Sequence, residues 1–115
     1  MAKGKPLLTV SVSPDADNDL WEIWCDNVQL YKNVDLADSY LAFLRTGINQ
    51  LGSSYPDGRD VEGFPEFQYV ILRKSKKGHG HCVIFRVDER LQLVKVLRVY
   101  HTRMDILGRL KAQFG

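Results

Sequence analysis

Cysteine and long apolar runs are both scarce in this sequence. Only two of the 115 residues are cysteines, and Cys25 and Cys82 stand in no CxxC or other metal-binding spacing. Such isolated residues are typical of free, mostly buried thiols in a reducing compartment, and they argue against a disulfide-stapled secreted protein. No apolar run approaches the roughly 18 residues that a membrane-spanning helix requires. We therefore expect a cytoplasmic protein with no membrane association.

The sequence also lacks the short motifs of several enzyme classes. It contains no Gly-rich phosphate loop, nucleophile elbow or carboxylate pair, so nothing in it supports a kinase, a hydrolase or a dinucleotide-binding protein. His79 and His81 flank a glycine and could offer two imidazoles to a metal, but no third ligand is near them in the sequence. We interpret this segment as a solvated turn, and we expect neither a metal nor a cofactor.

Charge is divided unevenly along the chain, although the net charge is only +2. Residues 1–66 carry 5 Lys+Arg and 11 Asp+Glu, whereas residues 67–115 carry 11 Lys+Arg and 3 Asp+Glu. If the cations of the second half gather on one surface, that surface would suit an acidic protein segment or nucleic acid. The alternative is that the two halves fold together and their charges mix.

The first half of the chain predicts a strand followed by two helices. Residues 7–12 alternate and are rich in β-branched types, which indicates a strand after a flexible arm over residues 1–6. Ser13 and Pro14 should cap a first helix that extends to about residue 32. A second amphipathic helix should begin near Asp35 and end at Gly52, because glycine is favoured after the last helical turn. The two helices would form a hairpin.

The second half predicts mainly strands. The segment SSYPDGRDVEGFP, residues 53–65, consists of turn-forming residues and should hold no regular structure. Three strand-like runs follow at 67–73, 81–87 and 91–101, and their short links favour antiparallel pairing. A short helix should begin near Met104. We therefore predict one α+β domain over residues 1–115: an N-terminal strand, a helical hairpin, a three-stranded antiparallel meander that forms one small sheet, and a short C-terminal helix.

The last predicted strand carries the most functional side chains. Alternate residues of a strand share one face of the sheet. Regular alternation gives two expected sets: Val94, Val96, Arg98 and Tyr100 on one face, and Leu97, Val99 and His101 on the other.

Five segments, taken in order, resemble the ParE/RelE superfamily, the small toxins of type II toxin–antitoxin pairs. PDADNDLWEIW resembles the first helix of that superfamily, YPDGRDV its Pro-x-x-Gly-Arg loop, YVILR and CVIFRVD its central hairpin, and VLRVYHTRMD its final strand. The resemblance covers roughly residues 8–107. It implies the fold predicted above and a toxin that is neutralised by a cognate antitoxin, with operator DNA bound only through that antitoxin.

The details are more similar to ParE, whose members are understood to poison DNA gyrase, than to RelE, whose members cut mRNA in the ribosome. The spacing from His101 to Asp105, with Met104 between them, is similar to ParE-type endings. Arg86 and Tyr100 depart from the family pattern, which usually has tyrosine and leucine or isoleucine there. The hairpin SKKGHG is longer than normal and KAQFG extends the end, so the transfer of individual residue roles is weakened.

A RelE-like ribonuclease is the alternative function. Metal-independent RNA cleavage needs a base for the ribose 2′-hydroxyl, cations for the phosphorane and an acid for the leaving oxygen. The candidates for these roles are Arg73, Lys74, Arg86, Arg98, Tyr100 and His101. Each also has a structural interpretation, in which the arginines pair with acidic residues, Tyr100 packs under the last helix and His101 caps that helix or bonds a buried carbonyl. RelE-like cutters look as though they carry catalytic side chains very near the chain end, where this sequence has none, and we favour no catalytic residue.

The favoured interpretation is therefore a gyrase-binding toxin whose last strand and terminal helix contact the target. His101, Arg103 and Met104 are the expected target-binding residues, and Arg73, Lys74 and Arg98 should face acidic residues of the antitoxin. In the alternative, the partners are the ribosome and mRNA. A further alternative is a non-toxic relative that serves only as an antitoxin-binding co-repressor.

Overall fold

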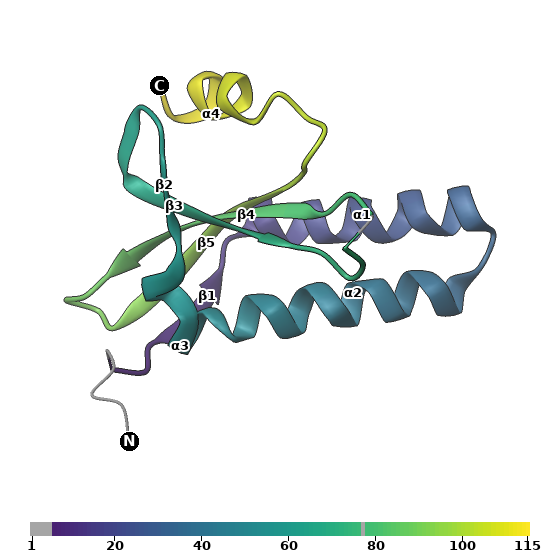
Figure 1. Cartoon of the computed structure of the whole chain (residues 1–115), viewed down its shortest axis with the longest axis horizontal. Helices are drawn as coiled ribbons and strands as arrows, with labels where there is room; N and C mark the ends of the chain where they lie inside the picture. The colour runs from purple at the N-terminus through teal and green to yellow at the C-terminus, as the bar shows by residue number, and fades with distance from the viewer. Residues whose placement is uncertain (1–5, 77) are drawn as a thin grey trace.

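The computed structural model describes residues 6–76 and 78–115 (Figure 1). All but the last residue of the predicted arm, 1–6, lies outside the described residues. Pro6 is described, and its carbonyl accepts a hydrogen bond of 3.0 Å from the Tyr55 hydroxyl. Among the described helices, none has the length and hydropathy needed to cross a bilayer.

The predicted α+β architecture is confirmed, with one strand more than expected in the sheet. The sheet has five strands in the order β1-β5-β4-β3-β2, in which β1 runs parallel to β5 and the remaining neighbours are antiparallel. The elements are β1 (Thr9–Val12), α1 (Pro14–Tyr31), α2 (Val34–Asn49), α3 (Leu51–Ser54), the 3₁₀ turn η1 (Tyr55–Asp57), β2 (Arg59–Val61), β3 (Phe64–Leu72), β4 (His81–Asp88), β5 (Leu93–His101) and α4 (Ile106–Phe114).

The helical hairpin forms where capping residues predict it. The Ser13 hydroxyl accepts a hydrogen bond from the Ala16 amide, and Pro14 occupies the first turn of α1. Helix α1 ends at Tyr31, and the cap residue Lys32 adopts the left-handed conformation with φ of 53°. The next residue, Asn33, caps α2 by accepting from the Leu36 amide. One pair of consecutive residues thus ends the first helix and starts the second.

Two expectations about residues 52–65 are wrong. Gly52 is not the cap of α2, which ends at Asn49. It lies within α3, where a Cβ would stand 2.6 Å from the carbonyl oxygen of Leu8, so glycine is needed for the close approach of the residue that precedes β1. The segment 53–65 also contains regular structure, because residues 59–61 pair with β3 across a turn at Gly63, whose φ is +82°. A three-residue strand of this kind depends on its partner strand rather than on its own sequence pattern.

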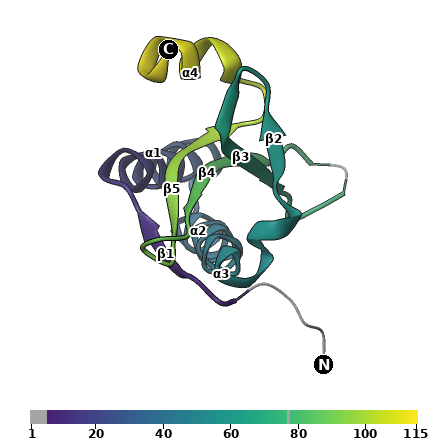
Figure 2. The same ribbon diagram turned by 90° about the vertical axis from the view of Figure 1, so that its left-hand side faces the viewer.

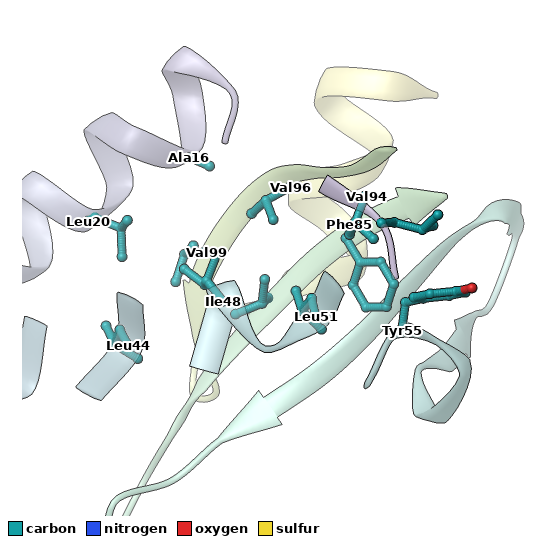
Figure 3. Close-up of a cluster of buried hydrophobic side chains, with 12 residues drawn as sticks. Ala16, Leu20, Leu44, Ile48, Leu51, Tyr55, Phe85, Val94, Val96 and Val99 are labelled. Atoms are coloured by element: carbon teal, nitrogen blue, oxygen red, sulfur yellow. The ribbon is translucent and has the colours of Figure 1, made fainter. Parts of the chain in front are cut away.

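Two hydrophobic clusters lie on opposite faces of the sheet. The hairpin and the inner sheet face form the first, in which Figure 3 shows Phe85, Val94 and Val96 of the sheet beside Leu51 and Tyr55. The second lies beneath α4 and includes Ile84, Tyr100 and the fully buried Leu110. Figures 1 and 2 show α4 on one side of the sheet, with the paired helices α1 and α2 on the other.

A bulge in β5 overturns the expected division of its faces. Ile84 pairs with Arg98 while the next residue, Phe85, pairs with Val96, so Leu97 is an extra residue in β5. The bulge reverses the alternation. Val94, Val96 and Val99 face the helical hairpin, whereas Leu97 and Tyr100 pack on the α4 side. Arg98 and Tyr100 do stay together, as expected, but they do not share a face with Val94 and Val96.

Candidate functional site

A groove of about 830 Å³ runs between the helical hairpin and the end of the sheet. Its hairpin wall, from α1 and α2, carries acidic and apolar side chains that include Glu22, Asp26, Leu30 and Leu36. The opposite wall, from the β3–β4 link, the segment after β5 and α4, carries the cationic Lys74, Arg103 and Arg109. We call this feature the groove. It places acidic and basic groups on opposite sides, so the charges of the two halves of the chain are only partly mixed.

Arg98 and Asp19 form the electrostatic anchor of the groove. The Arg98 guanidinium donates two hydrogen bonds of 2.8 Å to the carboxylate of Asp19, and the Val99 amide donates a third of 2.9 Å to the same group. Asp19 is 9% exposed, so α1 places a buried carboxylate beside the bulge. This carboxylate accepts from the Val99 amide, which β1 cannot pair with because β1 pairs with β5 only at residues 93–96. The hydrogen bonds that the Arg98 guanidinium donates to Asp19 raise the pKa of Arg98. The Arg98 charge is therefore largely neutralised within the chain.

Tyr100 lies beneath α4 in the second cluster. The side chain is 2% exposed, and its hydroxyl has no hydrogen-bond partner among the described residues. The Arg98 guanidinium carbon lies 4.9 Å from the centre of the Tyr100 ring, within the range of a cation–π contact. Burial raises the pKa of the phenol, so the hydroxyl stays protonated at neutral pH and this group is no ready base.

Three histidines gather where β4 begins and β5 ends. His81 and His101 are cross-strand partners whose rings meet edge to face at 5.1 Å, and His79 lies 5.8 Å from His101. The Nδ1 atom of His81 lies 2.6 Å from the hydroxyl of Tyr40 on α2. Burial lowers the pKa of His81 to about 4, with help from nearby His101. The expected solvated turn is therefore wrong for His81, which is buried, although it holds for the exposed His79.

The three expected target-binding residues follow one another at the rim of the groove. The Arg103 amide donates a 3.0 Å hydrogen bond to Nδ1 of His101, and the Arg103 guanidinium bonds Nε2 of His79. Both acceptor nitrogens must be unprotonated for these bonds to form. Burial, His79 and Arg103 together lower the pKa of His101. Arg103 is exposed and Met104 is 42% exposed, so both side chains are available to a partner.

The expected antitoxin-binding residues divide between two surfaces. Lys74 lines the groove and donates a hydrogen bond of 2.7 Å to the Ser39 hydroxyl, and Arg98 lines the groove as well. Arg73 does not. It borders a separate depression together with Arg59, Tyr69 and Ile71.

The candidate ribonuclease residues are likewise dispersed. Arg73 lies at the separate depression. Arg86 is on the central strand β4, where its cross-strand neighbour on β5 is Lys95. Arg98 is engaged by Asp19, and the Tyr100 hydroxyl is buried. Of the six candidates, Lys74, Arg98, Tyr100 and His101 border the groove.

The two cysteines lie outside the lining of the groove, whereas His79 and His81, the two imidazoles considered for a metal, are part of it. Cys25 and Cys82 are free, as expected, and burial raises the pKa of Cys82 to about 11. No three His, Cys, Asp or Glu side chains gather as a metal site within the described part of the chain.

Several groove residues were missed from the sequence. By itself the sequence indicates for Tyr40 only a place in the apolar stripe of α2, and for Asp19 only a favourable acidic charge near the start of α1. Arg109 carried no signal beyond its charge. The partners of Tyr40 and Asp19 lie 41 and up to 80 positions away, so no local pattern could have revealed them.

The fold and the sequence both match known toxins. The sequence model of the family described as "ParE toxin of type II toxin-antitoxin system, parDE" matches residues 10–106. No curated protein matches the chain at a significant level.

Three solved structures show the same fold at low sequence identity. A chain of the chromosomal ParDE toxin–antitoxin system from P. aeruginosa superposes with a TM-score of 0.66 and 16% identity, covering 83% of this chain and 96% of that one. The free E. coli toxin RelE, as a double mutant, superposes with a TM-score of 0.58 and 12% identity, and the match covers 94% of this chain and 99% of that one. A chain of the RelBE2 toxin–antitoxin complex from Mycobacterium tuberculosis superposes with a TM-score of 0.51 and 16% identity, and the match covers 83% of this chain and 98% of that one. Because the family model spans most of the chain, this protein belongs to the ParE toxin family of type II toxin–antitoxin systems.

Proposed function

We propose that this toxin acts by binding DNA gyrase and holding it in its DNA-cleaved state, and that a cognate antitoxin neutralises it by filling the groove. The observation that carries the proposal is the position of His101, Arg103 and Met104. They lie within residues 101–104, from the last residue of β5 into the link before α4, and line the groove, with Arg103 and Met104 exposed. A cation beside an accessible apolar side chain is a common composition for a protein-binding contact.

Binding accounts for the site better than RNA cleavage does. A ribonuclease needs a base, an acid and free cations around one phosphate. Here Arg98 is held by Asp19, the Tyr100 hydroxyl is covered, and Nδ1 of His101 already accepts from the Arg103 amide. The similarity to RelE supports a common fold but not a common reaction. Cleavage of ribosome-bound mRNA remains the alternative outcome of the test below.

The groove gives the antitoxin a defined role. An inserted segment would bury the apolar side chains of the hairpin wall, while its acidic residues would pair with Lys74 and Arg103 on the opposite wall. Arg98 contributes less to this pairing, because its charge is already met by Asp19. Such a segment would cover Arg103 and Met104, so the antitoxin and gyrase could not bind together. Contact with operator DNA would then pass through the antitoxin alone.

A supercoiling assay with the antitoxin-free chain tests this proposal. The chain should stop gyrase from supercoiling plasmid and should produce linear DNA trapped with the enzyme. Replacing Arg103 and Met104 by alanine and His101 by asparagine should raise the inhibitory concentration about thirtyfold or more, because loss of an interface hot spot costs about 2 kcal/mol. Asparagine keeps an acceptor near the Arg103 amide. Arg90→Ala, in the exposed β4–β5 turn, is the matched control and should inhibit normally.

Three outcomes would contradict the proposal. If a folded, growth-arresting chain leaves gyrase unaffected, assays for ribosome-bound mRNA cleavage should follow, with Arg98, Tyr100 and His101 mutated first. If expression of the chain alone does not arrest growth, the result favours the alternative of a non-toxic, antitoxin-binding co-repressor. Full inhibition by the folded triple variant would move the target-binding site away from the groove rim.

A further inference from the structure

Two tryptophans are stacked on the outside of the helical hairpin. Trp21 and Trp24 lie about one helical turn apart on α1, and their ring centres are 5.2 Å apart with an angle of 15° between the planes. Trp21 is 59% exposed, although tryptophan is highly buried on average. Because Trp24 covers one face of the Trp21 ring, most of this exposure belongs to the opposite face and the ring edge.

The stacked tryptophans belong neither to the core nor to the groove. Both side chains lie outside the two hydrophobic clusters and outside the lining of the groove, to which α1 contributes other residues, such as Glu22, Asp26 and Leu30. They are also the only tryptophans of the chain. An exposed aromatic pair of this kind is typical of a surface that contacts a partner.

Helix α2 holds the pair in position. The indole Nε1 of Trp24 donates a hydrogen bond of 2.8 Å to the carboxylate of Asp38. Helices α1 and α2 run side by side (Figure 1), and a second contact across the same seam joins Arg45 to Asp17 at 3.4 Å. Trp24 is therefore fixed by a hydrogen bond, and Trp21 rests on an ordered ring. A preorganised surface loses little entropy when a partner binds to it.

Carboxylates lie at both ends of the stacked rings. Asp17 is one turn before Trp21 on α1, and helical side chains lean toward the N-terminus, so the open face of Trp21 is on the side of Asp17. Asp38 lies at the other end, beside Trp24. Each of the two carboxylates has one oxygen that accepts no hydrogen bond from a described residue. We call Asp17, Trp21, Trp24 and Asp38 the indole patch.

The surroundings of the indole patch are acidic as well. Residues 14–49, which form the hairpin, carry seven Asp+Glu and two Lys+Arg. A flat aromatic face bordered by carboxylates matches the guanidinium of arginine, which is planar, stacks on indole rings and donates paired hydrogen bonds to carboxylates. Lysine carries the same charge without the planar group.

The spacing of the two carboxylates suits a pair of arginines. Asp17 and Trp24 are seven residues apart on α1, a rise of about 10 Å along the helix. In an extended segment, two residues separated by one other residue have Cα atoms about 7 Å apart. The long side chains of two such arginines cover the remaining distance.

We propose that the indole patch binds an extended segment of a partner protein with the pattern Arg–x–Arg. One guanidinium stacks on the open face of Trp21 and bonds Asp17, displacing Arg45 from its exposed ion pair. The other bonds the free oxygen of Asp38. Because the patch lies outside the groove, the segment binds whether or not the groove is occupied. The inference goes beyond the proposed function and depends on neither gyrase nor the antitoxin.

A second copy of this chain is the less suitable occupant. At 59% exposure, Trp21 offers roughly 90–150 Å² of surface, whereas each partner in a standard stable interface contributes about 800 Å². The patch is therefore large enough for arginine side chains but small for the centre of a dimer. Pairing the patch with itself would also bring the carboxylates of both copies into one interface, and like charges there are destabilising.

The tryptophans themselves report binding to the intact chain. The probe is the peptide Gly-Ser-Arg-Gly-Arg-Ser-Gly, added to the isotopically labelled chain, and the indole N–H signals of Trp21 and Trp24 are followed by NMR. Both signals should shift and reach saturation. In Trp21→Leu, the Trp24 signal should show binding weakened about fivefold, because the stacking face is lost. Leu30→Ala, an exposed change on the groove wall, is the matched control and should bind the probe normally.

Two variants at the end of the patch test the role of charge with opposite signs. Asp17→Asn should weaken binding about threefold, because an exposed carboxylate contact is lost. Arg45→Gln should tighten binding, because it frees the Asp17 carboxylate that Arg45 occupies. Both positions are exposed, so both variants should keep the thermal midpoint of the parent chain.

A second peptide separates guanidinium recognition from simple charge attraction. With both arginines replaced by lysine, the probe keeps its charge and should bind about threefold more weakly. Equal binding of the lysine peptide, undiminished binding by Trp21→Leu, shifts confined to groove residues, or no saturable shift with the arginine peptide would each overturn the proposal. Concentration-dependent dimers of the free chain that Trp21→Leu dissociates would overturn it too, and would assign the patch to a second copy.

Discussion

Replacing Asp19 by alanine should destabilise the fold far more than the loss of an ordinary ion pair. The carboxylate accepts hydrogen bonds from the Arg98 guanidinium and from the Val99 amide, at 2.8 and 2.9 Å. Its removal leaves a buried amide without an acceptor, which costs about 1–3 kcal/mol. It also leaves Arg98 without a counter-ion. Breaking a buried pair costs about 3–5 kcal/mol, and the 23% exposure of the Arg98 side chain favours the lower end of that range.

We therefore expect Asp19→Ala to lower the free energy of unfolding by about 3 kcal/mol. For a chain of this length, that corresponds to a fall in the thermal midpoint of about 12 °C. Urea and thermal unfolding followed by circular dichroism would measure both quantities. A double-mutant cycle with Arg98→Met should give a coupling energy of about 1 kcal/mol or more, because the two side chains share a direct contact.

The chain supplies its own control for this experiment. Asp17 and Arg45 also form an ion pair, at 3.4 Å, but their side chains are 63% and 50% exposed. Asp17→Ala should cost no more than about 0.5 kcal/mol, because water and salt screen such a pair. If Asp19→Ala unfolds at the same urea concentration as Asp17→Ala, the buried carboxylate does not anchor the bulge and the reasoning fails.

Two further predictions concern pH and packing. Because burial lowers the pKa of His81 from 6.5 to about 4, the unfolded chain binds more protons than the folded chain between these values, and the free energy of unfolding should fall as the pH is lowered through that window. Urea titrations at about pH 7.5 and pH 5 measure how much the free energy of unfolding changes with pH. The variant His81→Gln keeps an acceptor for the Tyr40 hydroxyl and should reduce this change. If the change is the same in the variant, other groups cause it. Gly58→Ala should destabilise by about 1–3 kcal/mol, because the new Cβ would press on the buried Phe85 ring. Gly78→Ala, where the nearest atoms are 3.8 Å away, is the control for urea unfolding and should be nearly neutral.

The parts of the fold that depend on local chemistry could be predicted from the sequence. Helix α1 starts where Ser13 and Pro14 indicate, because an N-cap acts on amides only a few residues away. The order of strands and helices followed from hydrophobic periodicity, which reports burial directly. The short strand β2 could not be predicted, since its residues resemble a turn and pair only because β3 is beside them.

The details of the site depended on contacts between distant residues. Regular alternation failed in β5 because Leu97 bulges out, and the bulge is accommodated by Asp19, which lies 80 positions from Val99 in the chain. His81 was expected in solvent, yet Tyr40 of α2 covers it. In each case a side chain on the helical hairpin determines the environment of a strand residue. A single sequence carries no record of such pairings, and so it predicted the candidate residues better than their surroundings.

The parallel pairing of β1 with β5 has a consequence for the order in which the molecule can fold. Ser13 bonds the backbone of Leu97, a residue 84 positions later, while every other strand pair joins consecutive strands. Closing a loop of that length costs about 4 kcal/mol of chain entropy, against about 1.5 kcal/mol for a tight hairpin. The hairpins can therefore form early, and the sheet is completed last. On the ribosome, β1 must wait until β5 has left the exit tunnel, so a nascent chain cut short before residue 93 has no complete sheet and no groove.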